Sequence, residues 1–156
     1  MTPAVIWTMT AVALVLVVLL GAMPLKRLMR RREEGVALKS FRLQRELLEA
    51  KFFDLAGSLG KQRGLRWKEC DWQPAVTFAR DCRTHLLTAF VAVDIHFEAI
   101  AGGDMEDVAA VDTVRDAVAL FHYEQGRWGT GGRALFNMNP EDAIIRFKDQ
   151  YEPIIS

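Results

Sequence analysis

Residues 85–100 read HLLTAFVAVDIHFEAI, and the alternation of apolar and polar side chains in this stretch decides the fold class. The odd-numbered residues from 87 to 99 are all apolar, whereas the even-numbered residues include Asp94, His96 and Glu98. Because residues two apart share a face of a β-strand, one face here is apolar and the later half of the other face is polar. The pattern predicts a half-buried strand in an antiparallel sheet that has one wet face.

Shorter stretches on both sides repeat the two-residue period. LRWKECDW (65–72), which ends at QP, and AVTFARD (75–81) predict two strands before the long one. AVALFHYE (117–124) and the RW that follows QG predict a hairpin, with Gly126 in a two-residue turn that requires positive φ. RALFNM (133–138) completes the strand pattern. Strands joined by such short turns pair antiparallel.

Two helices are predicted around these strands. Between Glu33 and Gly60 the apolar residues follow the three-and-four spacing of one helical face: Leu38, Phe41, Leu48, Phe52, Leu55 and Leu59. Two heptads also fit this face, but Arg45 occupies a seam position, so packing on the chain's own sheet is favoured over a dimer seam. NPEDAIIRFKDQY (139–151) begins with an N-cap asparagine, a proline at the first helical position and two acidic residues.

The fold class that follows is α+β. We expect an antiparallel sheet of four or five strands in a meander, covered on one face by the long N-terminal helix and the C-terminal helix.

The first 25 residues carry no charged side chain. Residues 4–25 include eleven Val, Leu or Ile residues and are long enough for a helix that crosses the hydrocarbon core. Their summed insertion free energy is about −3 to −7 kcal/mol. A cleaved signal peptide is disfavoured, because no basic residue precedes the apolar run. The sequence therefore predicts a single transmembrane anchor, whose anchoring side chains are Trp7, Leu14, Leu16, Leu19 and Leu20.

A basic collar follows the apolar run directly, formed by Lys26, Arg27, Arg30, Arg31 and Arg32. By the positive-inside rule, this collar predicts that the N-terminus lies outside and that the C-terminal domain is cytoplasmic. Each basic residue can also bind anionic lipid headgroups with about 1 kcal/mol, so membrane lipids are expected partners. The predicted organisation is an anchor at 1–25, the collar at 26–34 and an α+β domain at 35–156.

The remainder of the chain is acidic. Residues 33–156 contain 15 Lys or Arg and 20 Asp or Glu, a net charge of −5 with histidine neutral. Such a domain is poorly suited to binding phosphates, so nucleic acid is not expected as a partner. Cys70 and Cys82 match no zinc spacing, and a disulfide between them is disfavoured in a reducing compartment. No cofactor is expected. Arg80 and Arg83 would favour a thiolate at Cys82, but the turn there offers no base.

The strongest candidate for chemistry lies in the long strand and its partner. Asp94, His96 and Glu98 share one strand face, and His122 and Glu124 share a face in LFHYE. If antiparallel pairing brought the two histidines together, the five side chains could hold zinc, manganese or iron, or transfer protons. A solvated sheet face explains the same residues and is favoured.

The function favoured by these observations is a membrane-anchored, non-enzymatic interaction module, an accessory or assembly subunit of a larger membrane protein complex. Its expected partners are other membrane-protein subunits. A first alternative is a small-ligand or lipid-binding domain with a pocket between sheet and helix, to which Trp67, Trp72 and Trp128 could contribute. A second alternative is a metal-dependent enzyme that uses His96 and His122.

Overall fold

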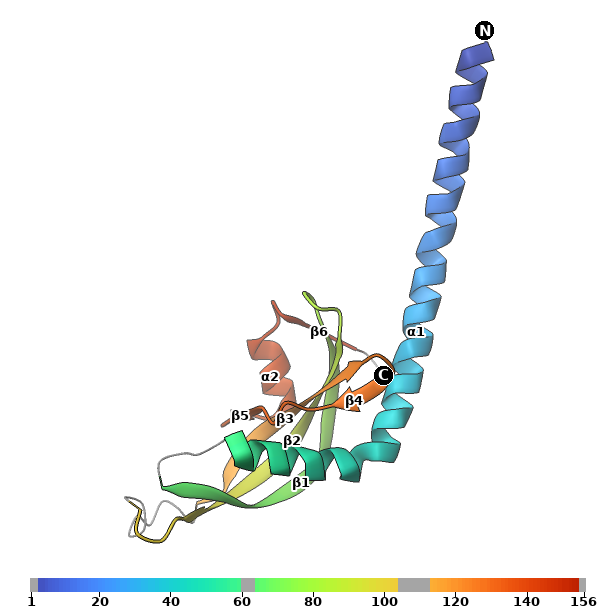
Figure 1. The fold of residues 1–156 in the computed structure, drawn as a ribbon. Coiled ribbons are helices and arrows are strands. Elements are labelled where there is room, and N and C mark those ends of the chain that lie inside the picture. The colour runs from blue at the N-terminus through green and yellow to red at the C-terminus, as the bar shows by residue number, and fades with distance from the viewer. Residues whose placement is uncertain (1–2, 60–63, 104–112, 155–156) are drawn as a thin grey trace. The chain divides into compact units, whose positions relative to one another are not determined.

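The computed structural model describes residues 3–59, 64–103 and 113–154, with side chains from Pro24 onward (Figure 1). The chain divides into two compact units, Met1–Lys39 and Ser40–Ser156, which we consider one at a time.

The first unit is helical. Helix α1 (Pro3–Leu59) begins here and runs into the second unit, and Pro24 lies inside it without ending it. The side chains of the predicted anchor as far as Met23 lie outside the described residues, so the transmembrane prediction stays a prediction. Within the part of the chain that is described, no helix has an apolar stretch long enough to cross a bilayer. All five basic residues of the collar are exposed to solvent.

The second unit contains one antiparallel sheet of six strands, which confirms the α+β class. The strand order is β4-β3-β2-β1-β6, with β5 paired beside β4 on β3. Among the described residues the sheet therefore has six strands, more than the four or five expected, and the short β6 gives no alternating pattern of its own. The elements are β1 (Leu65–Asp81), β2 (Leu87–Ala99), β3 (Arg115–Glu124), β4 (Arg127–Gly129), β5 (Ala134–Phe136), α2 (Pro140–Arg146) and β6 (Tyr151–Pro153).

Strand β1 corrects the prediction of two strands separated at QP. It is continuous, but its pairing with β2 is irregular between Trp72 and Val76. Pro74 has no N–H to donate, so the ladder is interrupted there while the chain stays extended. The carbonyl of Gln73 accepts a hydrogen bond from the Arg45 guanidinium of α1. An arginine on the inner face of the helix thus satisfies a backbone group that the irregular pairing frees.

Residues 40–59 of α1 cover one face of this sheet (Figure 1). Phe41 is 1% exposed, and its ring lies 4.9 Å from Trp128, 5.5 Å from Phe78 and 5.7 Å from Phe121 between centroids. Phe52 makes similar edge contacts with the rings of Trp67 and Trp72. Such aromatic pairs are worth about 0.5–1.5 kcal/mol each beyond the area they bury.

The buried stripe of the helix differs at its end from the predicted one. Phe41, Leu48 and Phe52 are buried as expected, but the stripe continues at Ala56. Leu55 is 37% exposed and Leu59 is 70% exposed, so these two positions do not belong to the buried stripe. The predicted position Leu38 belongs to the first unit.

Helix α2 packs on the opposite face, so the expectation that both helices cover one face is wrong. Its Ala143 and Ile144 join a core cluster with Phe90, Val118 and Leu120. Phe90 is an even-numbered residue of β2 and is fully buried, so only the later half of this second face stays wet. The N-cap prediction is confirmed, since the Asn139 side chain accepts a hydrogen bond from the Asp142 N–H at 2.9 Å. The helix ends at Arg146, and Tyr151 begins β6 instead of continuing the helix.

Two glycines set local geometry in the second unit. Gly126, with φ of 80° after Gln125 at 50°, forms the predicted two-residue hairpin turn between β3 and β4. Gly132 has φ of 70° and lies against α1: an added Cβ would stand 2.8 Å from the Ala56 nitrogen and 3.0 Å from the Leu55 carbonyl carbon. A side chain at Gly132 would therefore push this segment away from the helix.

Candidate functional site

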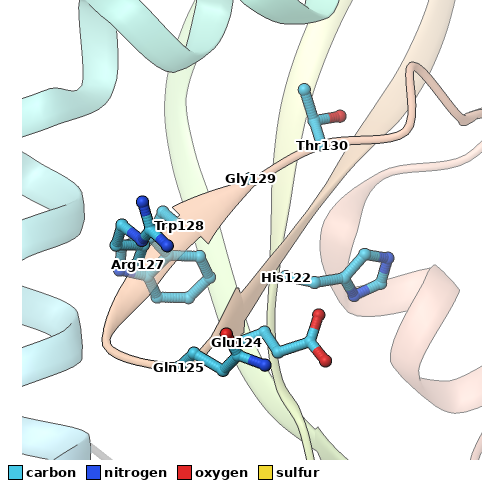
Figure 2. Close-up of a pocket in the computed structure, with 7 residues that line it drawn as sticks. All are labelled: His122, Glu124, Gln125, Arg127, Trp128, Gly129 and Thr130. Atoms are coloured by element: carbon cyan, nitrogen blue, oxygen red, sulfur yellow. The ribbon is translucent and has the colours of Figure 1, made fainter.

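The β3–β4 hairpin borders an open pocket of about 410 Å³ (Figure 2). Its walls come from the end of β3, the turn and β4, and they are lined by His122, Glu124, Gln125, Arg127, Trp128, Gly129 and Thr130. The hairpin turn thus brings an imidazole, a carboxylate and a guanidinium into one short segment of chain.

His122 is the titratable group that the fold perturbs here. Burial lowers its pKa below 6.5; the Arg133 charge lowers it further, while Asp81 and Glu124 act in the opposite direction. Its Nδ1 lies 3.1 Å from the Thr88 hydroxyl on the neighbouring strand. The lowered pKa favours the neutral imidazole, which is in hydrogen-bond contact with Thr88.

The polar groups of this pocket do not converge. Figure 2 shows the His122 ring and the Glu124 carboxylate on one side of the hairpin, with Arg127 and Trp128 on the other. The Thr130 hydroxyl donates to the Leu120 carbonyl at 2.9 Å. A nucleophile needs a base within hydrogen-bond reach and an oxyanion site in line with it, and these residues provide neither arrangement.

The residues considered as metal ligands are divided between distant parts of the sheet. Strands β2 and β3 do pair antiparallel, but the register places His122 opposite Thr88. His96 lies eight residues further along β2, which is about 26 Å at the usual rise per residue. The two histidines therefore do not meet, and Glu124 lies with His122 at the hairpin, far from Asp94 and Glu98. No cluster of three or more metal-ligating side chains is found among the described residues.

Each polar residue of the DIHFE stretch instead has a partner on β1. His96 Nε2 lies 2.8 Å from Asp71 Oδ2, and Gln73 Nε2 donates to Asp94 Oδ2 at 2.8 Å. Arg66 forms an ion pair with Glu98.

This wet face is strongly acidic. Asp71 of β1 lies opposite Asp94 of β2, which in turn lies opposite Asp116 of β3. Three carboxylates thus stand in a row across three strands, an arrangement that is unfavourable by itself because like charges face each other. The β1 members, Asp71 and Gln73, escaped the sequence reasoning because an irregularity near Lys68 shifts the alternation of that strand.

A second polar cluster lies where β1 ends. The Asp81 carboxylate accepts hydrogen bonds at 2.8 Å from the backbone N–H groups of Arg83 and Thr84, and the Gln150 amide donates to it at 3.1 Å. The hydrogen bond from Thr84, with those from Gln150 and Arg83, lowers the pKa of Asp81 to about 2 although burial opposes the shift. An aspartate often accepts hydrogen bonds from the backbone N–H groups of the turn that follows it, so this cluster accounts for the turn at residues 81–84 (DCRT).

The two cysteines are free and lie in different surroundings. Burial, and then the charges of Asp71 and Glu69, raise the pKa of Cys70 to about 12. Cys82 is exposed, and its backbone N–H donates to the Gln150 carbonyl at 2.8 Å.

Of the three tryptophans considered as pocket walls, Trp128 borders the hairpin pocket, and all three pack against α1. Trp128 is 6% exposed and packs on Phe41, while Trp67 and Trp72 pack on Phe52. Aromatic rings thus fill the space between the sheet and this helix.

No protein-family model, curated protein or solved structure matches this chain.

Proposed function

We propose that this chain is a membrane-anchored, non-enzymatic interaction module that serves as an accessory or assembly subunit of a larger membrane protein complex. The observation that carries the proposal is the order of the N-terminal residues. Twenty-five residues without a charged side chain are followed at once by five basic ones. This order is typical of a single-pass anchor whose C-terminal side stays in the cytoplasm.

The exposure of the collar supports this proposal. Lys26, Arg27 and the arginines at 30–32 are all open to solvent, as a contact with anionic headgroups requires. At about 1 kcal/mol for each basic residue near an anionic surface, they would hold the start of the domain against the bilayer.

The sheet domain supports the interaction role. Its apolar interior is packed with aromatic rings, and polar side chains of its wet face pair between β1 and β2. Its surface carries an acidic sheet face around Asp71, Asp94 and Asp116. On α1, Leu43 and Leu47 are 79% and 66% exposed. Surfaces of this kind suit contact with other protein chains, and nothing in the described residues assembles a catalytic group.

The anchor is tested by extraction and protection. We expect full-length protein in bacterial membranes to resist alkaline carbonate, and its domain to be shielded from protease added to intact spheroplasts. Replacing the five collar residues by glutamine should weaken this topology, whereas the same number of Lys or Arg to glutamine changes within 40–156 should leave it intact. Release by carbonate, or digestion of the domain in intact spheroplasts, would contradict the proposal.

The complex is tested by size. Native membranes solubilised in mild detergent should yield the chain in a particle that also contains other membrane proteins, identified by mass spectrometry. A particle that holds only copies of this 17.6 kDa chain and detergent would contradict the accessory-subunit role, but it would not contradict the membrane anchor.

A further inference from the structure

Among the described residues, the edge of the sheet at β1 has a partner over only part of its length. On the side of β1 away from β2, pairing within the described residues is confined to β6, at Ala79–Asp81. The first part of the strand, Leu65–Trp72, pairs with β2 on one side only. An unpaired edge presents backbone N–H and C=O groups that a further strand can use.

This edge segment is self-complementary. If LRWKECDW pairs antiparallel with the same eight residues of a second copy, with the two-fold axis between Lys68 and Glu69, every residue meets a suitable neighbour. Lys68 then lies opposite Glu69 of the other copy, and Arg66 lies opposite Asp71. The apolar or sulfur-containing side chains also meet, since Leu65 lies opposite Trp72 and Trp67 lies opposite Cys70.

The irregularity in β1 is what makes this pairing possible. In a regular strand Arg66 and Asp71 would point to opposite faces, so they could not stand opposite each other across a two-fold axis. Here Arg66, Glu69 and Asp71 share one face, because they lie opposite Glu98, His96 and Asp94. Trp67, Cys70 and Trp72 share the other face, opposite Phe97, Ile95 and Val93. The extra residue at Lys68, which has no ladder partner on β2, therefore matches the faces of the three outer pairs in this register: Leu65 with Trp72, Arg66 with Asp71, and Trp67 with Cys70.

The charges on this edge also select the register. Lysine and a bulge on an edge strand usually prevent strand addition, because an incoming strand leaves the charge unpaired. In this register each lysine meets a glutamate and each arginine meets an aspartate, so a second copy supplies opposite charges along the edge. All four residues are exposed. Pro74 ends the segment, because it has no N–H to donate to a further strand.

We propose that two copies of this chain associate through antiparallel pairing of residues 65–72 of β1, so that their sheets join into one. The contact is isologous, because both copies use the same surface. If residue i of one copy pairs with residue j of the other, then residue j of the first copy pairs with residue i of the second. The proposal does not depend on the membrane anchor or on other subunits.

The test uses charge reversal at the centre of the contact. In the Lys68→Glu variant two copies bring four glutamates together, and in the Glu69→Lys variant they bring four lysines together. Each variant alone should associate about tenfold more weakly than the native chain, because two opposite-charge pairs become two like-charge pairs. An equimolar mixture of the two variants should regain the native affinity, since each glutamate then meets a lysine. The double variant K68E/E69K should also associate like the native chain.

The measurement is sedimentation equilibrium of the full chain in density-matched detergent. Lys148→Glu, an exposed change of the same charge outside β1, is the matched control and should leave association unchanged. Both reversed residues are exposed, so the reversals should not disturb folding. An unchanged circular dichroism spectrum checks this. A native chain that stays monomeric, or association that is unaffected by both reversals, or a mixture that behaves no better than either variant alone, overturns the proposal.

Discussion

The contact between Gly132 and helix α1 gives the sharpest test of the tertiary structure, because the chain offers a matched control. Gly126 and Gly132 both have positive φ, at 80° and 70°. An added Cβ at Gly126 meets nothing within 4 Å, whereas at Gly132 it meets the Ala56 nitrogen at 2.8 Å. Replacing each by alanine therefore imposes a similar backbone cost but a very different steric one.

The magnitudes follow from these two terms. A left-handed backbone costs alanine roughly 1–2 kcal/mol relative to glycine, and the lower entropy of its unfolded chain returns about 0.4–1 kcal/mol. Gly126→Ala should therefore lower the free energy of unfolding by at most about 1.6 kcal/mol. Gly132→Ala adds overpacking against the rigid backbone of α1, which costs about 1–3 kcal/mol more.

The assay is urea unfolding of the full chain in a non-denaturing detergent, followed by tryptophan fluorescence. Trp67, Trp72 and Trp128 all lie beneath α1, so their emission reports the loss of this packing. A lower midpoint at unchanged slope means lost stability without a change in the surface exposed. Equal losses in the two variants would refute the placement of the Gly132 segment against α1.

Three further outcomes are expected. Phe52→Ala should cost about 3–5 kcal/mol in the same unfolding assay, because the ring is fully buried among tryptophans. The Leu43 side chain is 79% exposed, so Leu43→Ala should change stability by less than about 0.5 kcal/mol. Equal effects would contradict the assignment of the inner helix face. The pKa of the Asp81 carboxylate is lowered from 3.8 to about 2, so this group stabilises the fold above pH 4 and loses its contribution as the pH falls from 4 toward 2. Asp81→Asn should reduce stability at pH 7 and flatten the loss of stability between pH 4 and pH 2. An unchanged acid unfolding curve would argue against the cap. At pH 8 a thiol reagent should modify Cys82 and spare Cys70, whose pKa is raised to about 12, until urea unfolds the chain. If mass spectrometry finds both cysteines labelled in the native protein, the raised pKa of Cys70 is contradicted.

The local part of the fold was readable from the sequence. The strict alternation of β2, the positive φ of Gly126 and the Asn139 cap each depend on a few neighbouring residues, and the structure bears out all three. Periodicity also identified the helix that packs through Phe41 and Phe52. These signals survive because a side chain's face in a strand or helix follows from the backbone repeat alone.

The candidate site shows where that reasoning ends. His96 and His122 each stand on the strand face expected for them, yet the register of β2 with β3 keeps them apart. Register depends on which apolar residues of two distant segments pack together, and alternation within one strand does not contain that information.

What the sequence determined by itself is a chain with an uncharged apolar start, a basic collar and an acidic α+β domain, because composition and period are local properties. Only the tertiary structure decided that the two helices lie on opposite faces of the sheet, that β1 runs through Pro74, and that the alternation of β1 shifts beside Lys68. These features come from contacts between residues far apart in the chain, such as Arg45 with Gln73, whose energies no single segment reveals.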